Sequence, residues 1–215
     1  EQQNWLKYNK AKTLSKIIVS GKDTAYEVPI VFHIVHTGDT IGSEFNPANV
    51  QIDSIINFLN ATWAATWSSY LDSSKGGTYI PIKFVLAKCD PNCNATTGIN
   101  RIDGTVFANY NNYGICPAGS YPGPSDEEIK KLSIWPSYDY LNIWVVNKIE
   151  NGTLGGYAPW PWYASGIILD GVVIGADKLK RSVLLGGNFD FAIVHEIGHA
   201  FGLYHTFQDG CDAGA

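Results

Sequence analysis

The sequence lacks several features that would assign it to common classes of protein. None of its apolar runs approaches the ~20 residues that a membrane-spanning helix needs. No cluster of lysine or arginine interrupts the formal charge of -5, which argues against nucleic acid or an anionic membrane as a partner. No basic-then-apolar leader is visible, so we expect that a signal peptide was removed or was never there. No repeat or low-complexity linker divides the 215 residues, and we expect a single globular unit.

The segment from Phe189 to Thr206 carries the strongest functional signal. It contains HEIGHAFGLYH, which is the pattern H-E-x-x-H-x-x-G-x-x-H. On a helix with about 3.6 residues per turn, His195 and His199 lie one turn apart on one face, so both imidazoles can reach one ion. Glu196 lies next to that face, where its carboxylate is badly placed as a ligand but can take a proton from a water held by the metal.

A third histidine extends this motif. His205 lies ten residues after His195, so a continuing helix could not bring it to the same ion. Gly202 supplies the required break, because a residue without a side chain adopts a left-handed backbone at low cost. Three neutral imidazoles plus one water form the open tetrahedral zinc site that is typical of catalysis.

The opposite face of the same helix is apolar, so the helix can be buried on one side and present a metal on the other. We expect Asn188 or Asp190 to cap its start. The apolar residues fall on an arc of roughly 120° and are Ile193, Val194, Ile197, Ala200 and Phe201.

The extended motif resembles the metzincin clan of zinc endopeptidases, and HEIGHAFGLYHTF followed by QDGC resembles its pappalysin family, including ulilysin and cytophagalysin-like members. The resemblance covers most of residues 28–212 and is most specific in the zinc motif. Other stretches that resemble this family are VPIVFHIVHTGD at 28–39, IPIKFVLAKCDP at 80–91, TTGINRI at 96–102, LNIWVVN at 141–147, LGGYAPWPW at 154–162 and DGVVIGAD at 170–177.

The resemblance implies an α+β zincin catalytic domain with a twisted mixed sheet. A helix over 47–71 would back the sheet, and a helix over 189–202 would form the floor of a cleft. Metzincins also have a methionine-containing turn beneath the metal, whereas this sequence contains no methionine. We therefore expect the C-terminal subdomain to be largely absent. The expected organisation is a leader or pro-region remnant (1–27), the N-terminal subdomain (28–202) and the start of the truncated C-terminal subdomain (203–215).

The implied activity is zinc-dependent hydrolysis of internal peptide bonds, with Glu196 as general base and acid. In metzincins a substrate binds as an added strand along the sheet edge, and Gly155, Gly156, Tyr157 and Ala158 occupy the corresponding rim. Protein or peptide substrates, a C-terminal fragment of the protein itself and secretion follow from the same resemblance. Two alternatives stay open: a catalytically impaired fragment that acts as a peptide-binding module, and a zinc amidohydrolase for non-protein amides.

The family resemblance also raises calcium as a second ion, through Asp209 and Asp212 near the end of the chain. Cys89 and Cys93 flank a turn-prone spacer and could close a tight disulfide, whereas Cys211 could pair elsewhere; a zinc knuckle is the rival interpretation of the first two. Membership of a secreted family would favour disulfides.

The remaining pattern predicts the other elements of the domain. Residues 28–36 form an apolar strand covered on both faces, on which His33 and His36 point to opposite faces and serve structural roles. Asn46 should cap a helix that runs to about Leu71. Further strands are expected at 79–88, 140–147 and 167–174, a surface insertion at 89–124, and a short helix that begins with a capping box of Ser125 and Glu128.

Overall fold

The computed structural model describes residues 15–18, 24–67, 72–182 and 188–206. A seven-stranded sheet runs through it in the order β1-β2-β5-β7-β6, and both β3 and β4 pair with β2. β1 and β6 are antiparallel to their neighbours, whereas the other pairings are parallel, which confirms the mixed sheet. The strands are β1 (Ser15–Ile18), β2 (Thr24–His36), β3 (Ile82–Leu86), β4 (Ile99–Asp103), β5 (Leu141–Val146), β6 (Gly156–Tyr157) and β7 (Val172–Gly175).

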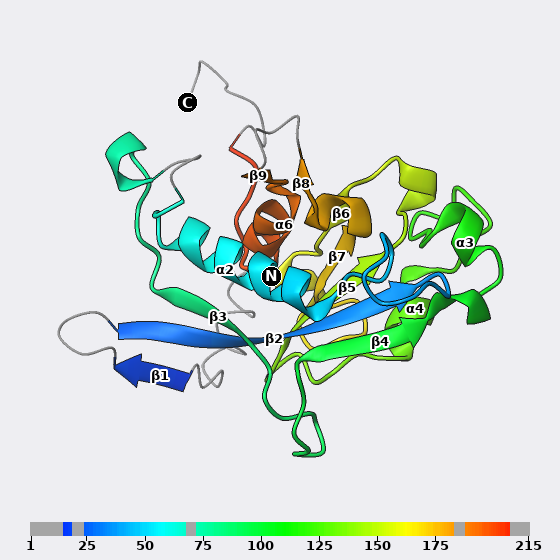
Figure 1. Cartoon of the computed structure of the whole chain (residues 1–215), viewed down its shortest axis with the longest axis horizontal. Coiled ribbons are helices and arrows are strands. Elements are labelled where there is room, and N and C mark those ends of the chain that lie inside the picture. Colours follow the sequence, from blue (N-terminus) through cyan, green and yellow to red (C-terminus); the bar gives the residue numbers. More distant parts are fainter. Residues whose placement is uncertain (1–14, 19–23, 68–71, 183–187, 207–215) are drawn as a thin grey trace.

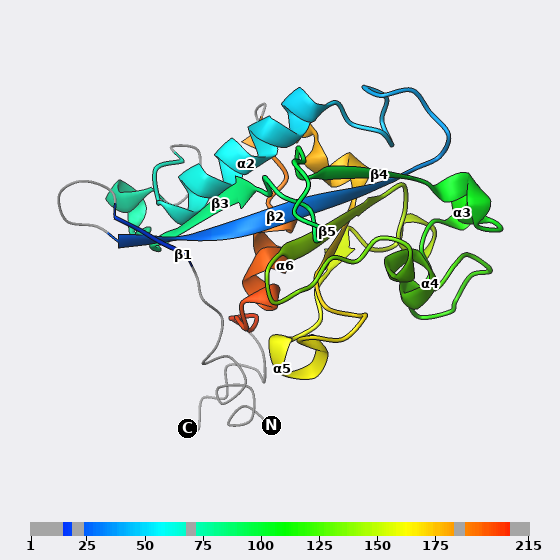
Figure 2. The same cartoon turned by 90° about the horizontal axis from the view of Figure 1, so that it is seen from below.

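Helices cover both faces of this sheet (Figures 1 and 2). α2 (Asn49–Trp63) and α6 (Ala192–Ala200) share one core with the sheet, while α3 (Tyr110–Tyr113) and α4 (Asp126–Lys131) flank the core on the other face. No helix in the described ranges is long and apolar enough to cross a membrane. The smaller elements are α5 (Pro161–Ala164), η2 (Ser73–Lys75), η3 (Gly104–Val106), η4 (Glu150–Gly152), η5 (Ala176–Leu179) and the hairpin of β8 (Arg181–Ser182) and β9 (Asn188–Phe189).

Alternation along the central strands explains why both faces are covered. In β5, Ile143 and Val145 enter the core beneath α2 and α6, whereas Trp144 and Val146 enter the core on the α4 side. Successive side chains of a strand point to opposite faces, so an apolar run of this kind requires a layer on each side. The sheet is therefore the middle layer of the domain.

The predicted strand at 28–36 is confirmed within β2, and its two histidines take no part in the histidine cluster near the C-terminal helix. His33 is fully buried, its Nε2 donates to Oδ1 of Asn142 at 2.9 Å, and its ring stacks on Trp144 with centroids 4.9 Å apart. The Nδ1 of His36 accepts a hydrogen bond from the backbone N–H of Gly38 at 3.1 Å.

The long helix is real but shorter than expected at both ends. The N-cap position belongs to Ala48 and has no side-chain cap, so the prediction that Asn46 caps this helix is wrong. Asn46 instead donates to the Asp39 carbonyl oxygen at 2.8 Å and accepts from the Arg101 guanidinium. The helix ends at Trp63, because Ala65 takes a left-handed backbone with φ of 53°. The predicted end at Leu71 lies outside the described residues.

The segment 89–124 is not only a surface insertion, because it contains β4. This strand pairs in parallel with β2, from Phe32 opposite Ile99 to His36 opposite Asp103. The expected strand at 79–88 shortens to β3, and that at 167–174 shortens to β7. The strand at 140–147 and the capping box of α4 are confirmed.

The expected disulfide between Cys89 and Cys93 is absent. Both are free thiols, as is buried Cys116, among the cysteines that the structure describes. The turn between the first two is closed by Asp90 instead, whose Oδ1 accepts from the backbone N–H groups of Asn92 and Asn94, each at 2.8 Å. Hydrogen bonds from the backbone to an aspartate suffice to form such a turn. Cys211, Asp209 and Asp212 lie outside the described residues.

Candidate active site

The helix α6 lies between the sheet and the surface, and its sequence explains this position. Ile193 and Ile197 are fully buried against the sheet, and Val194, Ala200 and Phe201 pack around the same core. At its start, Phe191 occupies the N-cap position, while the Asp190 carboxylate accepts from the backbone N–H of Ala192 at 2.9 Å. The apolar arc that the sequence predicts is the face that packs inward.

A left-handed residue ends this helix. Gly202 has φ of 87°, a region that residues with a side chain rarely adopt. Around it, the N–H of Gly202 donates to the His199 carbonyl oxygen at 2.8 Å, and the N–H of Leu203 donates to that of Gly198 at 2.9 Å. These bonds satisfy carbonyl groups at the helix end. The chain then leaves the helix and brings His205 back beside its last turn.

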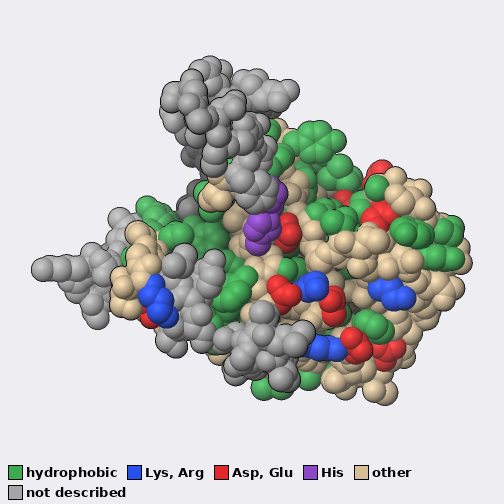
Figure 3. Space-filling model, turned by 90° about the horizontal axis from the view of Figure 1, so that it is seen from above, with side chains coloured by type: hydrophobic (Ala, Val, Ile, Leu, Met, Phe, Trp, Pro, Cys, Tyr) green, Lys and Arg blue, Asp and Glu red, His purple; other side chains and the backbone are tan. Residues whose placement is uncertain are grey.

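Three imidazole nitrogens meet at this point. The Nε2 atoms of His195 and His199 lie 3.0 Å apart, and the Nε2 of His205 lies 3.1 Å from each of them. Nitrogen atoms this close together could all bind one ion, because a Zn–N bond measures about 2.0–2.1 Å. The three histidines therefore fit a zinc site. Figure 3 shows histidine side chains at the surface, beside an acidic side chain.

The buried histidine of the three is held by groups behind it. Nδ1 of His199 lies 2.7 Å from the Leu203 carbonyl oxygen. A carbonyl oxygen only accepts, so Nδ1 carries the hydrogen and Nε2 keeps its lone pair for a metal. The indole of Trp160 meets the same imidazole edge to face, with centroids 4.8 Å apart. Trp160 also stacks on Trp162, and both rings contact Tyr204.

Glu196 lies beside the cluster and is more deeply buried than His195 and His205. Its side chain is buried, with 8% of the residue exposed. Burial raises the pKa of Glu196 to about 7, and a hydrogen bond from the backbone of Ala158 opposes that rise. A carboxyl group with a pKa near neutrality can both accept and return a proton.

The strand β6 forms the rim next to this carboxyl. β6 pairs antiparallel with β7 and is the last strand of the sheet path among the described residues. A side chain at Gly156 would come within 2.9 Å of Cγ of Glu196, so only glycine allows so close an approach. The Gly155 carbonyl oxygen accepts from the Gly175 N–H at 2.9 Å, which extends the pairing. Of the four predicted rim residues, Gly156 and Ala158 therefore lie directly beside Glu196, whereas the Tyr157 hydroxyl bonds to Asp126.

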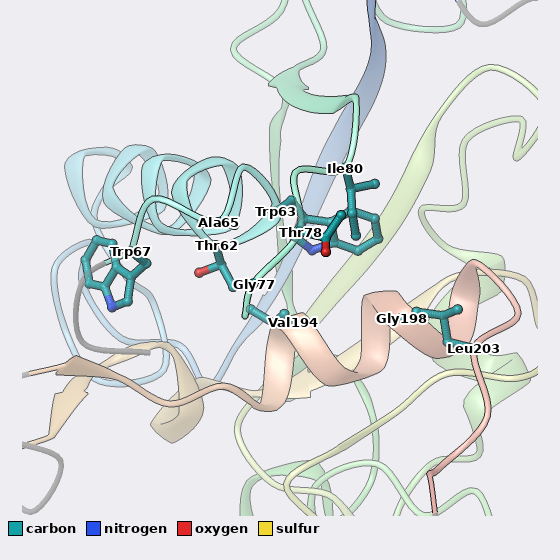
Figure 4. Close-up of a pocket in the computed structure, with 10 residues that line it drawn as sticks. All are labelled: Thr62, Trp63, Ala65, Trp67, Gly77, Thr78, Ile80, Val194, Gly198 and Leu203. Carbon is teal, nitrogen blue, oxygen red and sulfur yellow. The ribbon is translucent and has the colours of Figure 1, made fainter. Parts of the chain in front are cut away.

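A separate cavity of about 230 Å³ lies on another side of α6, between this helix and the end of α2 (Figure 4). Val194 and Gly198 of α6 and Leu203 just after it line one side, and Trp63 and Trp67 line the other. Neither indole N–H has a hydrogen-bond partner within the described part of the chain. None of the three clustered histidines lines this cavity, so it is distinct from the candidate active site.

Sequence reasoning missed the groups that contact His199 and Glu196. The Leu203 carbonyl and the Ala158 N–H belong to the backbone and leave no signal in residue identity. Trp160 is visible in the run WPW, but nothing in the sequence indicates which histidine it would contact.

Comparisons with known proteins agree with a metal site at the three histidines, because the relatives are metalloproteases. The family model described as "Pregnancy-associated plasma protein-A" matches residues 123–215. An extracellular metalloprotease of Sordaria macrospora is 34% identical over 196 residues, which are 87% of this chain and 53% of that protein. An extracellular metalloprotease of Pyricularia oryzae is 39% identical over 77 residues, 35% of this chain and 27% of that protein. The chain thus spans about half or less of the length of these relatives.

Solved structures of mirolysin share the fold. The structure titled mirolysin in complex with compound 9 has a TM-score of 0.66 and 26% identity, covering 86% of this chain and 66% of that one. Mature mirolysin of Tannerella forsythia in complex with a cleaved peptide has a TM-score of 0.61 and 27% identity, covering 90% and 68%. Together with the histidine motif and the mixed sheet, these matches support a pappalysin-like metzincin.

Proposed function

We propose that this chain is the zinc-binding part of a secreted endopeptidase that hydrolyses internal peptide bonds. The observation that carries the proposal is one arrangement: three Nε2 atoms within 3.1 Å of one another, beside a buried carboxyl and a sheet edge. His195, His199 and His205 are the proposed ligands. Secretion is proposed from relatives that are named extracellular metalloproteases.

Each group has a role in the proposed reaction. Zinc, when bound, supplies the Lewis acidity that polarises the scissile carbonyl and acidifies a water molecule. Glu196 accepts a proton from the attacking water at its carboxylate and delivers that proton to the departing amine nitrogen. Burial of Glu196 supports both steps, because its raised pKa brings the two protonation states close in free energy.

The proposed substrate is an extended polypeptide that pairs with β6. An added strand needs an edge with free backbone groups, and β6 provides one beside Glu196. The proposed rim is Gly155, Gly156, Tyr157 and Ala158. A mirolysin structure that contains a cleaved peptide supports a peptide substrate for this fold.

The domain boundaries remain part of the proposal. We propose that residues 28–202 form the N-terminal subdomain of the catalytic domain and that a second subdomain begins at 203, where Gly202 turns the chain. The extracellular metalloproteases that match this chain are longer than it is, which is consistent with a further segment that contributes to the active site. Two other functions, a peptide-binding module without turnover and a zinc hydrolase of small amides, would use the same metal ligands.

The test is hydrolysis of an unstructured protein substrate by the purified chain. We expect cleavage at internal bonds, loss of cleavage with a chelator and recovery with added zinc. Binding of peptide without cleavage in the zinc-loaded protein would favour the peptide-binding module. Cleavage of small amides alone would favour the amidohydrolase.

A further inference from the structure

A buried ionic network lies on the side of β6 that faces away from Glu196. The Tyr157 hydroxyl donates to Oδ1 of Asp126 at 2.6 Å, and Nζ of Lys130 lies 3.1 Å from Oδ2 of the same carboxylate. Nζ of Lys130 also donates to the Leu169 carbonyl oxygen at 2.8 Å. Three segments that are distant in sequence therefore meet: β6, the helix α4 and the loop before β7.

The positive charge of this network is fully buried, and its carboxylate is mostly buried. Lys130 has no exposed surface, and its ammonium lies over the ring of Trp144, 4.9 Å from the centroid, and 5.7 Å from that of Tyr157. Burial lowers the pKa of Lys130, and the charge of Asp126 opposes this. A buried ion pair with further hydrogen bonds has one well-defined geometry, because any displacement leaves a charge without a partner.

The strand that this network contacts needs such support. β6 contains only two residues, and its pairing with β7 consists of Gly156 opposite Ile174 and Tyr157 opposite Val173. Side chains alternate along a strand, so Tyr157 points toward α4 while its neighbours on either side face the site. Gly156 lies against Glu196, and the Ala158 N–H hydrogen-bonds to it. Tyr157 therefore lies between the two residues, Gly156 and Ala158, whose backbones contact Glu196.

We infer that Tyr157, Asp126 and Lys130 are positioning residues, which fix the substrate-pairing strand relative to Glu196. The expected effect on KM rests on the proposed function, whereas the expected effect on the strand itself does not. None of the three side chains touches the reacting bond. They act by holding the Gly155–Ala158 backbone in one place, so that a bound peptide strand and the carboxyl keep a constant separation.

The experiment compares Tyr157→Phe with Tyr163→Phe in the zinc-loaded protein. Tyr157→Phe removes one hydroxyl and keeps the ring, while Tyr163 is an exposed tyrosine on α5 and serves as the matched control. The first readout is amide hydrogen exchange of residues 155–158, which requires no activity. We expect exchange there to rise by about tenfold in Tyr157→Phe, the factor for one lost hydrogen bond to a charged group, and to stay unchanged in the control.

The second readout separates KM from kcat on two substrates. One is a long peptide that can pair along β6, and the other is a short peptide that spans only the scissile bond. We expect Tyr157→Phe to raise KM for the long peptide by about tenfold and to affect the short one less, with zinc content unchanged.

Exchange and KM like those of the control would overturn the inference. Faster exchange throughout the chain, with equal losses on both substrates, would also overturn it. If the wild type cleaves neither peptide, the proposed function fails, while the exchange experiment still decides whether the network holds β6.

Discussion

Nδ1 of His199 and the carbonyl oxygen of Leu203 lie 2.7 Å apart, so one turn of backbone both orients a proposed zinc ligand and redirects the chain toward the next one. The residue between them that makes this turn is Gly202, with φ of 87°. The end of the helix is therefore part of the candidate site. Changes at the turn should affect metal affinity as well as folding.

Alanine at Gly202 should destabilise the protein and weaken zinc binding. A side chain in the left-handed region costs roughly 1–2 kcal/mol, and loosening the turn releases His199 from Leu203. At about 2–4 °C per kcal/mol for a domain of this size, thermal denaturation should register the change as a lower Tm. Chelator competition should show lower zinc affinity.

Gly198 is the matched control, four residues earlier. A side chain there would meet the nearest atom of Leu203 at 3.6 Å, an ordinary contact, and the position is helical. Alanine at this position should raise stability by roughly 0.5–1 kcal/mol, because glycine is the poorer helix former. If both substitutions shifted Tm in the same direction, the assignment of the turn to Gly202 would be wrong.

Removal of the third imidazole should release the metal. His205→Ala takes away one of three proposed ligands, and loss of a group behind a ligand already costs about 10–100-fold in affinity, so we expect a decrease of more than about 100-fold. Competition with a zinc-binding dye measures this directly. His36→Ala is the control, since His36 lies outside the cluster. Equal zinc content in both variants would contradict a three-histidine site.

Acid should destabilise the fold through His33. Burial lowers the pKa of His33 to about 4 from an ordinary value of 6.5. As the pH falls from 6.5 to 4, the unfolded chain takes up a proton that the folded chain refuses, so stability decreases by about 3 kcal/mol. Below pH 4 both states bind the proton and this contribution stops changing.

His33→Gln should remove that dependence. Glutamine does not titrate and can still donate to Oδ1 of Asn142, which accepts from His33 at 2.9 Å. Urea denaturation at several pH values should therefore show a shallower loss of stability between pH 6.5 and 4 in the variant. An unchanged slope would mean that another group is responsible.

The elements that the sequence predicted well are those in which local pattern and tertiary packing agree. The apolar run of β5 and the Ser125–Glu128 capping box each satisfy local and global requirements, and both appear as expected. The two faces of α6 were predictable for the same reason, since histidines and apolar residues divide with helical spacing.

The misses arise where a distant partner decides the local structure. Asn46 looks like a helix cap, but Arg101 and Asp39 engage its side chain instead. β4 has little apolar pattern, and it becomes a strand because β2 offers a parallel partner. Cys89 and Cys93 suggest a disulfide, yet Asp90 closes the turn through backbone hydrogen bonds. Such pairings are set by tertiary contacts that single-sequence patterns do not contain.

The most direct test of the proposed mechanism is the rate of peptide hydrolysis by the zinc-loaded wild-type protein and by its Glu196→Gln variant. The substitution keeps the size of the side chain and removes its ability to accept a proton. We predict equal zinc content in the two proteins and a fall in kcat of at least about 100-fold in the variant, the lower range for general acid–base catalysis. Equal zinc content with unchanged kcat would contradict the role of Glu196 and, with it, the proposed mechanism.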